Sequence, residues 1–156
     1  MIVFRNLLFY PLFYLGSLIC VSAAALTAPL GRDYMQRWPD RWSRWHRWLC
    51  VNVLNIRVVV EGPHSSEPAL YAIRHESFFE AIDLPVLLDK PVPFAKTELF
   101  QIPGWGAAAR AYGSVEVKRD QGAVMLRRMV GEAKGFAADG RPLCIFPEGT
   151  RVAHDD

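Results

Sequence analysis

Three short motifs in the second half of the chain carry residue types that could act together in group transfer. The first, residues 74–80, offers a histidine, His75, with a carboxylate five residues later. The second, residues 96–106, begins with a lysine, and the third, residues 146–151, ends in an arginine beside a glycine. A histidine paired with a carboxylate can act as a general base near neutral pH, and lysine and arginine bind phosphate. In this order, the motifs indicate transfer of an acyl group to the hydroxyl of a phosphate-bearing acceptor.

The histidine and the glutamate of the first motif allow two interpretations. Glu80 follows His75 by five residues, which is about 140° round an ideal helix, so the two side chains meet only if His75 precedes the regular helix. Glu80 would then accept from one ring nitrogen and leave the other for a substrate. Residues 77–80, Ser-Phe-Phe-Glu, also fit a capping box, in which Glu80 bonds only the backbone N–H of Ser77. Alone, the motif favours the cap, whereas the downstream motifs favour the catalytic pair.

Basic residues in and near the later motifs could bind an anionic substrate. Arg151 follows an expected strand, a proline and a glycine, so its guanidinium can project from an open loop and bind phosphate through two hydrogen bonds. Lys96 and Arg119 could add positive charge to the same pocket. Glu148 could orient Arg151 or meet the acceptor. Taken singly, each basic residue is better explained by an ion pair on the surface, and the alternative for Glu148 is a salt bridge within the loop.

No motif in the sequence supplies a nucleophile from the protein. There is no serine nucleophile elbow or Walker loop, and Gly-Trp-Gly at residues 104–106 does not extend into a dinucleotide fingerprint. Cys20, Cys50 and Cys144 have neither paired spacing nor a histidine pattern for a metal. We therefore expect reduced thiols, no metal and no cofactor. The simplest scheme is direct attack of an activated substrate hydroxyl on a thioester co-substrate.

Short alternating elements after residue 50 must position these motifs. Apolar runs predict five strands, at residues 56–60, 69–73, 92–95, 114–117 and 143–146. Helical spacing predicts helices over residues 77–88, 104–111 and 120–138. This alternation predicts an α/β fold with a largely parallel sheet flanked by helices, over residues 51–156. The chain stops soon after the third motif, so we expect this domain to be incomplete.

The first part of the chain has the character of a membrane anchor. Residues 6–31 contain no charge and would span about 39 Å as a helix, which exceeds the roughly 30 Å of a bilayer core. Pro11 and Gly16 could kink this helix or turn it into a re-entrant hairpin. A secretory signal fits less well, because the run is long and basic sequence follows it. The excess of arginine after the run predicts that the anchor, residues 1–31, lies in the inner membrane with the remainder in the cytoplasm.

Residues 32–50 form a second segment rich in tryptophan and arginine. On a helix, four tryptophans fall on one stripe and four arginines flank it; these are Trp38, Trp42, Trp45 and Trp48, and Arg37, Arg41, Arg44 and Arg47. Tryptophan is typical of the headgroup level, and arginine is attracted to anionic lipid, so we predict a helix lying in the interface. The alternative is an amphipathic helix that packs its tryptophans on the catalytic domain. A net charge of only +2 argues against a nucleic-acid partner.

Residues 70–151 resemble the glycerolipid acyltransferase family, and within it the bacterial 1-acyl-sn-glycerol-3-phosphate (lysophosphatidic acid) acyltransferases. The third motif, Phe-Pro-Glu-Gly-Thr-Arg, matches that family's third block completely. The second block is matched through Lys96, Glu98, Leu99, Pro103, Gly106, Gly113 and Arg119. The first block is usually histidine, four residues and aspartate, so Glu80 departs from it. A fourth block, which follows the third in that family, has no counterpart in this chain.

The resemblance implies transfer of a fatty acyl group from acyl-CoA or acyl carrier protein to the free hydroxyl of lysophosphatidic acid, giving phosphatidic acid. It implies that His75 deprotonates this hydroxyl and that Glu80 orients His75. It also assigns the acceptor's glycerol phosphate to Glu148, Gly149, Thr150 and Arg151, with help from Lys96 and Arg119. The implied partners are membrane lipids and the acyl donor, with no nucleic acid.

Two other functions remain open at this point. The acceptor could be a different lysolipid or glycerol 3-phosphate, because the motifs do not separate these substrates. The chain could also be a non-catalytic protein that binds lipid at a membrane surface. Glu80 and the absent fourth block favour that second alternative.

Overall fold

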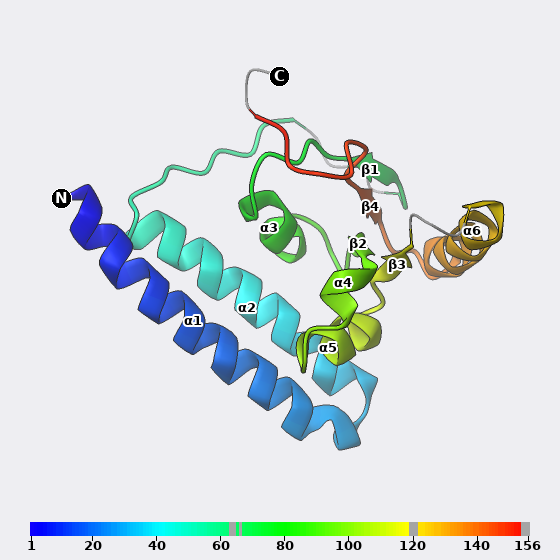
Figure 1. The fold of residues 1–156 in the computed structure, drawn as a ribbon, viewed down its shortest axis with the longest axis horizontal. Coiled ribbons are helices and arrows are strands. Elements are labelled where there is room, and N and C mark those ends of the chain that lie inside the picture. Colours follow the sequence, from blue (N-terminus) through cyan, green and yellow to red (C-terminus); the bar gives the residue numbers. More distant parts are fainter. Residues whose placement is uncertain (63–64, 66, 119–121, 154–156) are drawn as a thin grey trace.

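The computed structural model describes residues 1–62, 65, 67–118 and 122–153, without the side chain of Arg32. Within these residues, a long helical hairpin at the N-terminus packs against an α/β unit that holds all three motifs (Figure 1). The hairpin consists of α1, Ile2–Thr27, a short turn η1, Ala28–Leu30, and α2, Arg32–Asn52. The chain reverses at Gly31, whose φ of 111° lies in the region that favours glycine.

Three of the four tryptophans of the α2 stripe contact α1, and Trp48 is 49% exposed. Three indole N–H groups donate to α1: Trp38 to the Thr27 hydroxyl (2.9 Å), Trp42 to the Ser17 hydroxyl (2.8 Å) and Trp45 to the Leu12 carbonyl (3.2 Å). Gly16 admits the closest approach, since a Cβ at this position would lie 2.2 Å from the indole nitrogen of Trp45. The stripe on α2 therefore closes the hairpin, a contact that the sequence did not suggest. Trp38 and Trp42 also line a cavity with residues of α3 and α5, in agreement with the alternative that the tryptophans pack on the catalytic domain.

The outer side of α1 is a long apolar surface. The helix is continuous through Pro11 and Gly16, so the re-entrant turn considered for these residues does not form. Residues 2–30 are apolar and long enough to cross a membrane by length and composition, and 11% of the most apolar window is buried. Large apolar side chains that are exposed along α1 include Ile2, Phe4, Leu7, Tyr14, Leu15, Leu18 and Leu26.

The sheet has four parallel strands in the order β1-β4-β2-β3. They are β1, Leu70–Ala72, β2, Val92–Lys96, β3, Val115–Val117, and β4, Leu143–Ile145. Leu143 is the central register position, because it pairs with Leu70 on one side and Val92 on the other. All four strands therefore end at the same edge, and the α/β architecture predicted from the sequence is confirmed.

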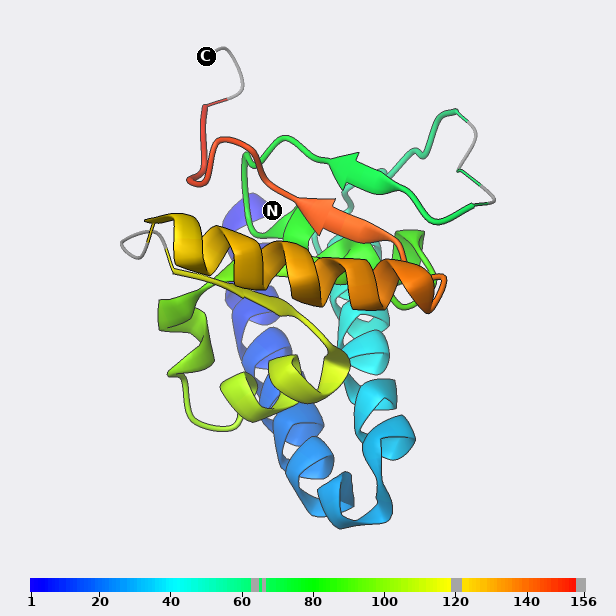
Figure 2. The ribbon, with the colours of Figure 1, turned by 90° about the vertical axis from the view of Figure 1, so that its right-hand side faces the viewer.

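Helices cover both faces of this sheet. On the hairpin side lie α3, Phe79–Leu87, the short α4, Thr97–Phe100, and α5, Trp105–Tyr112. Figure 2 shows α6, Gly122–Ala138, on the face turned away from the hairpin. The fully buried side chains Leu84, Val92, Val115 and Cys144 form the core between these layers.

Four of the five predicted strands and all three predicted helices are found within one to two residues of their expected ends. The strand predicted at residues 56–60 is wrong, since this segment is extended but pairs with no strand in the described structure. Its side chains explain why: Ile56, Val59 and Val60 are 46–56% exposed, so the β-branched run has no sheet face to pack on. The α4 turn was not anticipated, and the first residues predicted for α6, Asp120 and Gln121, lie outside the described residues.

Candidate active site

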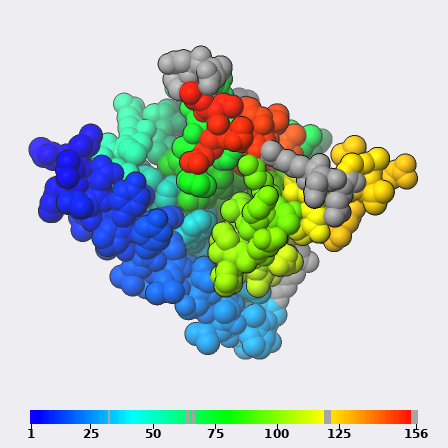
Figure 3. Space-filling view, in the orientation of Figure 1, coloured from blue at the N-terminus to red at the C-terminus, as the bar shows by residue number. Residues whose placement is uncertain are grey.

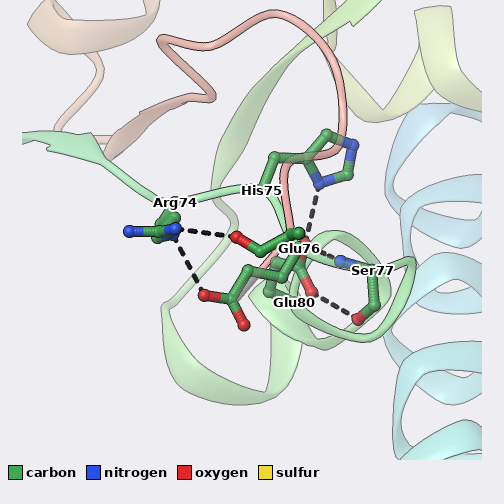
Figure 4. Close-up of polar contacts among 6 residues, drawn as sticks. Arg74, His75, Glu76, Ser77 and Glu80 are labelled. Carbon is green, nitrogen blue, oxygen red and sulfur yellow. Dashed lines mark hydrogen bonds and ion pairs between the residues drawn. The ribbon is translucent and has the colours of Figure 1, made fainter. Parts of the chain in front are cut away.

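The first motif forms a hydrogen-bonded pair at the edge where the strands end. After β1, residues 73–78 carry the chain into α3, so His75 precedes the regular helix as the pairing requires. His75 Nδ1 lies 2.7 Å from Glu80 Oε1 (Figure 4). The geometric condition set by the five-residue spacing is therefore met.

Ser77 completes the setting of the glutamate. Its backbone N–H donates to Glu80 Oε1 (2.8 Å) and its hydroxyl to Glu80 Oε2 (2.7 Å). The capping box and the His–Glu pair, which the sequence offered as alternatives, are thus present together. Burial alone would raise the pKa of the Glu80 carboxyl, but the hydrogen bonds from Ser77, from the backbone and from His75 outweigh it and hold this pKa below its ordinary value.

This environment fixes the tautomer of the histidine. An ionised carboxylate can only accept, so the proton of the His75–Glu80 bond resides on Nδ1, and Nε2 of the neutral ring is an acceptor. Figure 4 shows Nε2 directed away from Glu80. The ring also packs on Phe146 of the third motif, with centroids 4.5 Å apart, and its side chain keeps 18% exposure. Nε2 can therefore take a proton from an incoming hydroxyl.

The third motif lies directly against the first. Val152 N–H donates to the His75 carbonyl (2.8 Å), and the Arg74 guanidinium donates to the Ala153 carbonyl (2.8 Å). A tight turn within the third motif depends on Gly149, whose φ is 65° and whose N–H donates to the Phe146 carbonyl. The exposed Arg151 guanidinium rests over the ring of Phe78, 4.5 Å from its centroid. Contacts between residues 73 to 79 positions apart in sequence thus bring a cation to the start of the helix that holds Glu80.

The other predicted site residues are less closely gathered. Glu148 and Thr150 are exposed on the loop that carries Arg151. Lys96 is exposed at the end of β2, which is separated from β1 by β4, so it shares the edge but lies two strands away from His75. Arg119, the remaining candidate, lies outside the described residues.

Part of the second motif has a packing role. A Cβ on Gly106 would lie 1.9 Å from the carbonyl oxygen of Phe100, so only glycine lets α5 approach the end of α4 this closely. The Arg110 guanidinium also donates to that carbonyl (3.1 Å). The glycine of this block therefore sets the helix pair that follows Lys96.

An apolar cavity lies on the hairpin side of α3, immediately beyond Glu80. Its walls come from α1, α2, α3, β2 and α5, and they include Val21, Trp42, Ala81, Ile82, Trp105 and Ala108. Nearly all of its lining is hydrocarbon, which suits an alkyl chain and gives no polar partner to a sugar or a nucleotide.

The sequence did not predict a buried ion pair that lies on α3 three residues after Glu80. The His75–Glu80 pair is called the dyad from here on. Asp83, which is 0% exposed, accepts from Arg47 Nε of α2 at 2.7 Å, and a second contact joins Arg47 Nη2 to the other carboxylate oxygen. The sequence predicts Arg47 among the arginines that flank a lipid-facing stripe, and for this residue the prediction is wrong, because its guanidinium contacts Asp83. The available signal was Asp83 itself, an acid between Ile82 and Leu84 on an otherwise apolar stretch of helix.

A family model described as Acyltransferase matches residues 51–155, which is more than half of the chain. The chain belongs to the acyltransferase family. The matched range begins at the end of α2 and takes in the whole sheet, the His75–Glu80 pair and the Arg151 loop. The resemblance drawn from the three motifs is therefore confirmed at the level of the family.

Relatives of this acyltransferase domain extend the comparison. The chain is 26% identical over 153 residues to a 1-acyl-sn-glycerol-3-phosphate acyltransferase of Pseudomonas aeruginosa, covering 95% of this chain and 59% of that protein. It is 28% identical over 155 residues to a protein of that name from Chlamydomonas reinhardtii, covering 94% and 46%. The chain thus spans about half the length of these two relatives.

A solved structure supports the fold. The 1-acyl-sn-glycerophosphate (LPA) acyltransferase PlsC of Thermotoga maritima superposes with a TM-score of 0.66 at 24% identity, over 97% of this chain and 64% of that one. The match includes the N-terminal hairpin, because so little of the present chain is left out. Hairpin and α/β unit therefore belong to one shared fold.

Proposed function

We propose that this protein transfers a fatty acyl group from acyl-CoA or acyl carrier protein to the free hydroxyl of lysophosphatidic acid, giving phosphatidic acid. The observation that carries the proposal is the His75–Glu80 pair at 2.7 Å, with Ser77 holding both oxygens of the carboxylate. The names of the two curated relatives support the choice of acceptor.

In this scheme His75 Nε2 takes the proton of the acceptor hydroxyl as its oxygen attacks the thioester carbonyl. The tetrahedral intermediate collapses with cleavage of the C–S bond, and the imidazolium returns the proton to the leaving thiolate. Glu80 holds the ring in the required tautomer and stabilises the imidazolium in between. A positioned general base of this kind contributes about 10²- to 10⁴-fold in rate. No metal or cofactor takes part, and the thioester is a co-substrate.

Arg151 is the proposed anchor for the acceptor's phosphate. It is exposed, it rests on Phe78 beside the dyad, and a planar guanidinium binds a phosphate through two parallel hydrogen bonds. Glu148, Gly149 and Thr150 shape the loop around it. Lys96 and Arg119 would supply further positive charge from the neighbouring strand ends.

The apolar cavity beside α3 is the proposed place for the donor's acyl chain. Ala81 and Ile82 of its wall directly follow Glu80, so a chain lying in the cavity would reach the dyad with its thioester end. Burying each methylene in such a cavity gains about 0.8 kcal/mol.

We further propose that the hairpin holds the protein on the inner membrane, with the α/β unit in the cytoplasm. The apolar surface exposed along α1 supports membrane association, and the arginines that follow it support this orientation. Both acceptor and product are membrane lipids, which explains the joining of an anchor to this domain.

The test is transfer of a labelled acyl group to lysophosphatidic acid by purified protein in mixed micelles, for wild type and His75→Ala. We expect phosphatidic acid from wild type and a loss of about 10³-fold or more in the variant. Val124→Ala, on the exposed side of α6, serves as the control. Transfer only to another lysolipid, or only to glycerol 3-phosphate, would replace lysophosphatidic acid as the acceptor in this proposal. Lipid binding without any transfer would overturn the enzyme proposal in favour of a binding protein.

A further inference from the structure

A second apolar site, which we term the end groove, lies where the open end of the hairpin meets the first turn of α3. Ten residues line it: Phe9, His46, Cys50, Leu54, Ile56, Arg57, Val58, Val59, Ser77 and Phe79. Figure 3 shows the first turns of α1 beside the segment that follows α2 on this face of the molecule. The end groove shares no lining residue with the apolar cavity beside α3.

One end of this groove reaches the dyad. Ser77, which lines the end groove, donates to both oxygens of Glu80, and Phe79 follows the Phe78 ring that carries Arg151. An anionic headgroup held by Arg151 and a hydroxyl at His75 would therefore stand at the mouth of the groove. An alkyl chain attached to the same molecule would have an apolar path away from that mouth.

The remaining walls of the groove come from α1 and from the segment that follows α2. Phe9 of α1 is buried where it lines the groove. Ile56 and Val59, which also line the end groove, are 46% and 56% exposed. The unpaired segment that was predicted to be a strand therefore serves as a wall of the groove.

Two hydrocarbon chains take part in the proposed reaction, one on the donor and one on the acceptor. We propose that the end groove binds the alkyl chain of the lysolipid acceptor, while the apolar cavity beside α3 takes the acyl chain of the donor. The assignment follows from position: Arg151, the proposed anchor of the acceptor's phosphate, rests on Phe78, and Phe78 stands in the chain between Ser77 and Phe79, which both line the end groove. This inference rests on the proposed function and adds the place and direction of the acceptor.

The test measures kcat/KM for acceptors of different chain length after a larger side chain has been placed in the end groove. Val58→Trp should lower kcat/KM for 1-oleoyl lysophosphatidic acid about 10-fold more than for the 1-lauroyl form, because at least one or two methylenes lose their burial. Val58→Ala should shift the preference in the opposite direction. Mixed micelles with a fixed surface fraction of acceptor keep lipid partitioning constant. Val124→Trp, at a 77% exposed position on α6, is the matched control.

The donor provides the second arm of the experiment. Preference among donor chain lengths should stay unchanged in Val58→Trp, since the donor cavity is lined by other residues. An equal effect on all acceptors, or an altered donor preference, would overturn the inference while leaving acyl transfer intact.

A binding readout separates this inference from the proposed function. Lysophosphatidic acid with a diazirine near the middle of its chain should label Leu54, Val58 or Phe79 on irradiation, whether or not transfer occurs. Labelling of Trp105 or Ala108 in the apolar cavity beside α3 instead would refute the assignment. If wild type forms no phosphatidic acid but the groove is labelled, the proposed function fails and the binding site stands.

Discussion

Two carboxylates three residues apart on α3 meet very different surroundings. Glu80 keeps 20% of its side chain exposed and accepts from a histidine and a serine at the edge of the sheet. Asp83 is 0% exposed and accepts from Arg47 at the junction with the hairpin. The first pair leaves a ring nitrogen free for substrate, whereas the second has both carboxylate oxygens engaged.

The difference separates chemistry from attachment on a single short helix. A histidine can take and return a proton, so its pair with Glu80 can take part in a reaction. An arginine does not give up its proton at working pH, so its pair with Asp83 can only hold the two helices together. The α3 helix thus links the proposed catalytic edge to the hairpin, and three predictions test how far these two roles are separate.

The largest effect, on the free energy of unfolding, should come from removing one partner of the buried ion pair. Asp83→Ala leaves the Arg47 guanidinium without its partner at a helix junction, so we expect a loss of about 3–5 kcal/mol in the free energy of unfolding. Denaturant unfolding in detergent measures it. Arg128→Ala is the matched control, because it breaks an exposed i,i+4 pair with Glu132 and should cost only about 0.3–0.5 kcal/mol.

A double variant shows whether attachment alone matters at this junction. Arg47→Met with Asp83→Leu should recover most of the lost stability, since apolar side chains of similar size often replace a buried ion pair well. Equal losses for Asp83→Ala and Arg128→Ala would contradict our account of the buried pair.

The second effect should appear in rate. Glu80→Gln keeps the size of the side chain but removes the charge that fixes the tautomer, so we expect kcat to fall about 100-fold or more with little change in KM. Thermal unfolding of the same sample should shift far less than for Asp83→Ala. A variant that loses stability as strongly as Asp83→Ala would show that Glu80 is mainly a structural residue.

The sequence offered the His75–Glu80 contact and the cap as alternatives, and both could be recognised because the information is local. Residues 74–80 contain the histidine, the glutamate and the cap, and the strand before them is short and apolar. The parallel sheet also followed from the alternation of elements.

What the sequence could not predict depends on contacts between distant segments. Nothing in the local sequence distinguishes Arg47 from Arg44, yet Arg47 is the one that donates to the buried carboxylate of Asp83 on α3. The tryptophan stripe was recognised, but its partner was not, because α1 supplies hydroxyl and carbonyl groups that are invisible in a pattern of hydrophobicity. The run at residues 56–60 has strand composition without a neighbouring strand, so its extended form was predicted and its lack of pairing was not.

The smallest effect concerns pH and sharpens the role of Glu80. The folded-state pKa of this carboxyl lies below its ordinary value, so the ionised form contributes stability above the unfolded pKa of about 4.3. That contribution is lost as pH falls through the folded-state pKa. The stability gap between wild type and Glu80→Gln should therefore be present at neutral pH and close progressively below about pH 4.

Thermal unfolding in detergent across this pH range measures the gap. Thr150→Val changes no titrating group on the neighbouring loop, so its difference from wild type should stay constant and provides the baseline. A gap for Glu80→Gln that stays equally constant would mean that the hydrogen bonds from Ser77 and His75 do not favour the charged carboxyl. The charge of Glu80 would then contribute no stability to the fold, and the dyad would be distinguished from the buried pair by its exposure and by the proton that His75 can exchange.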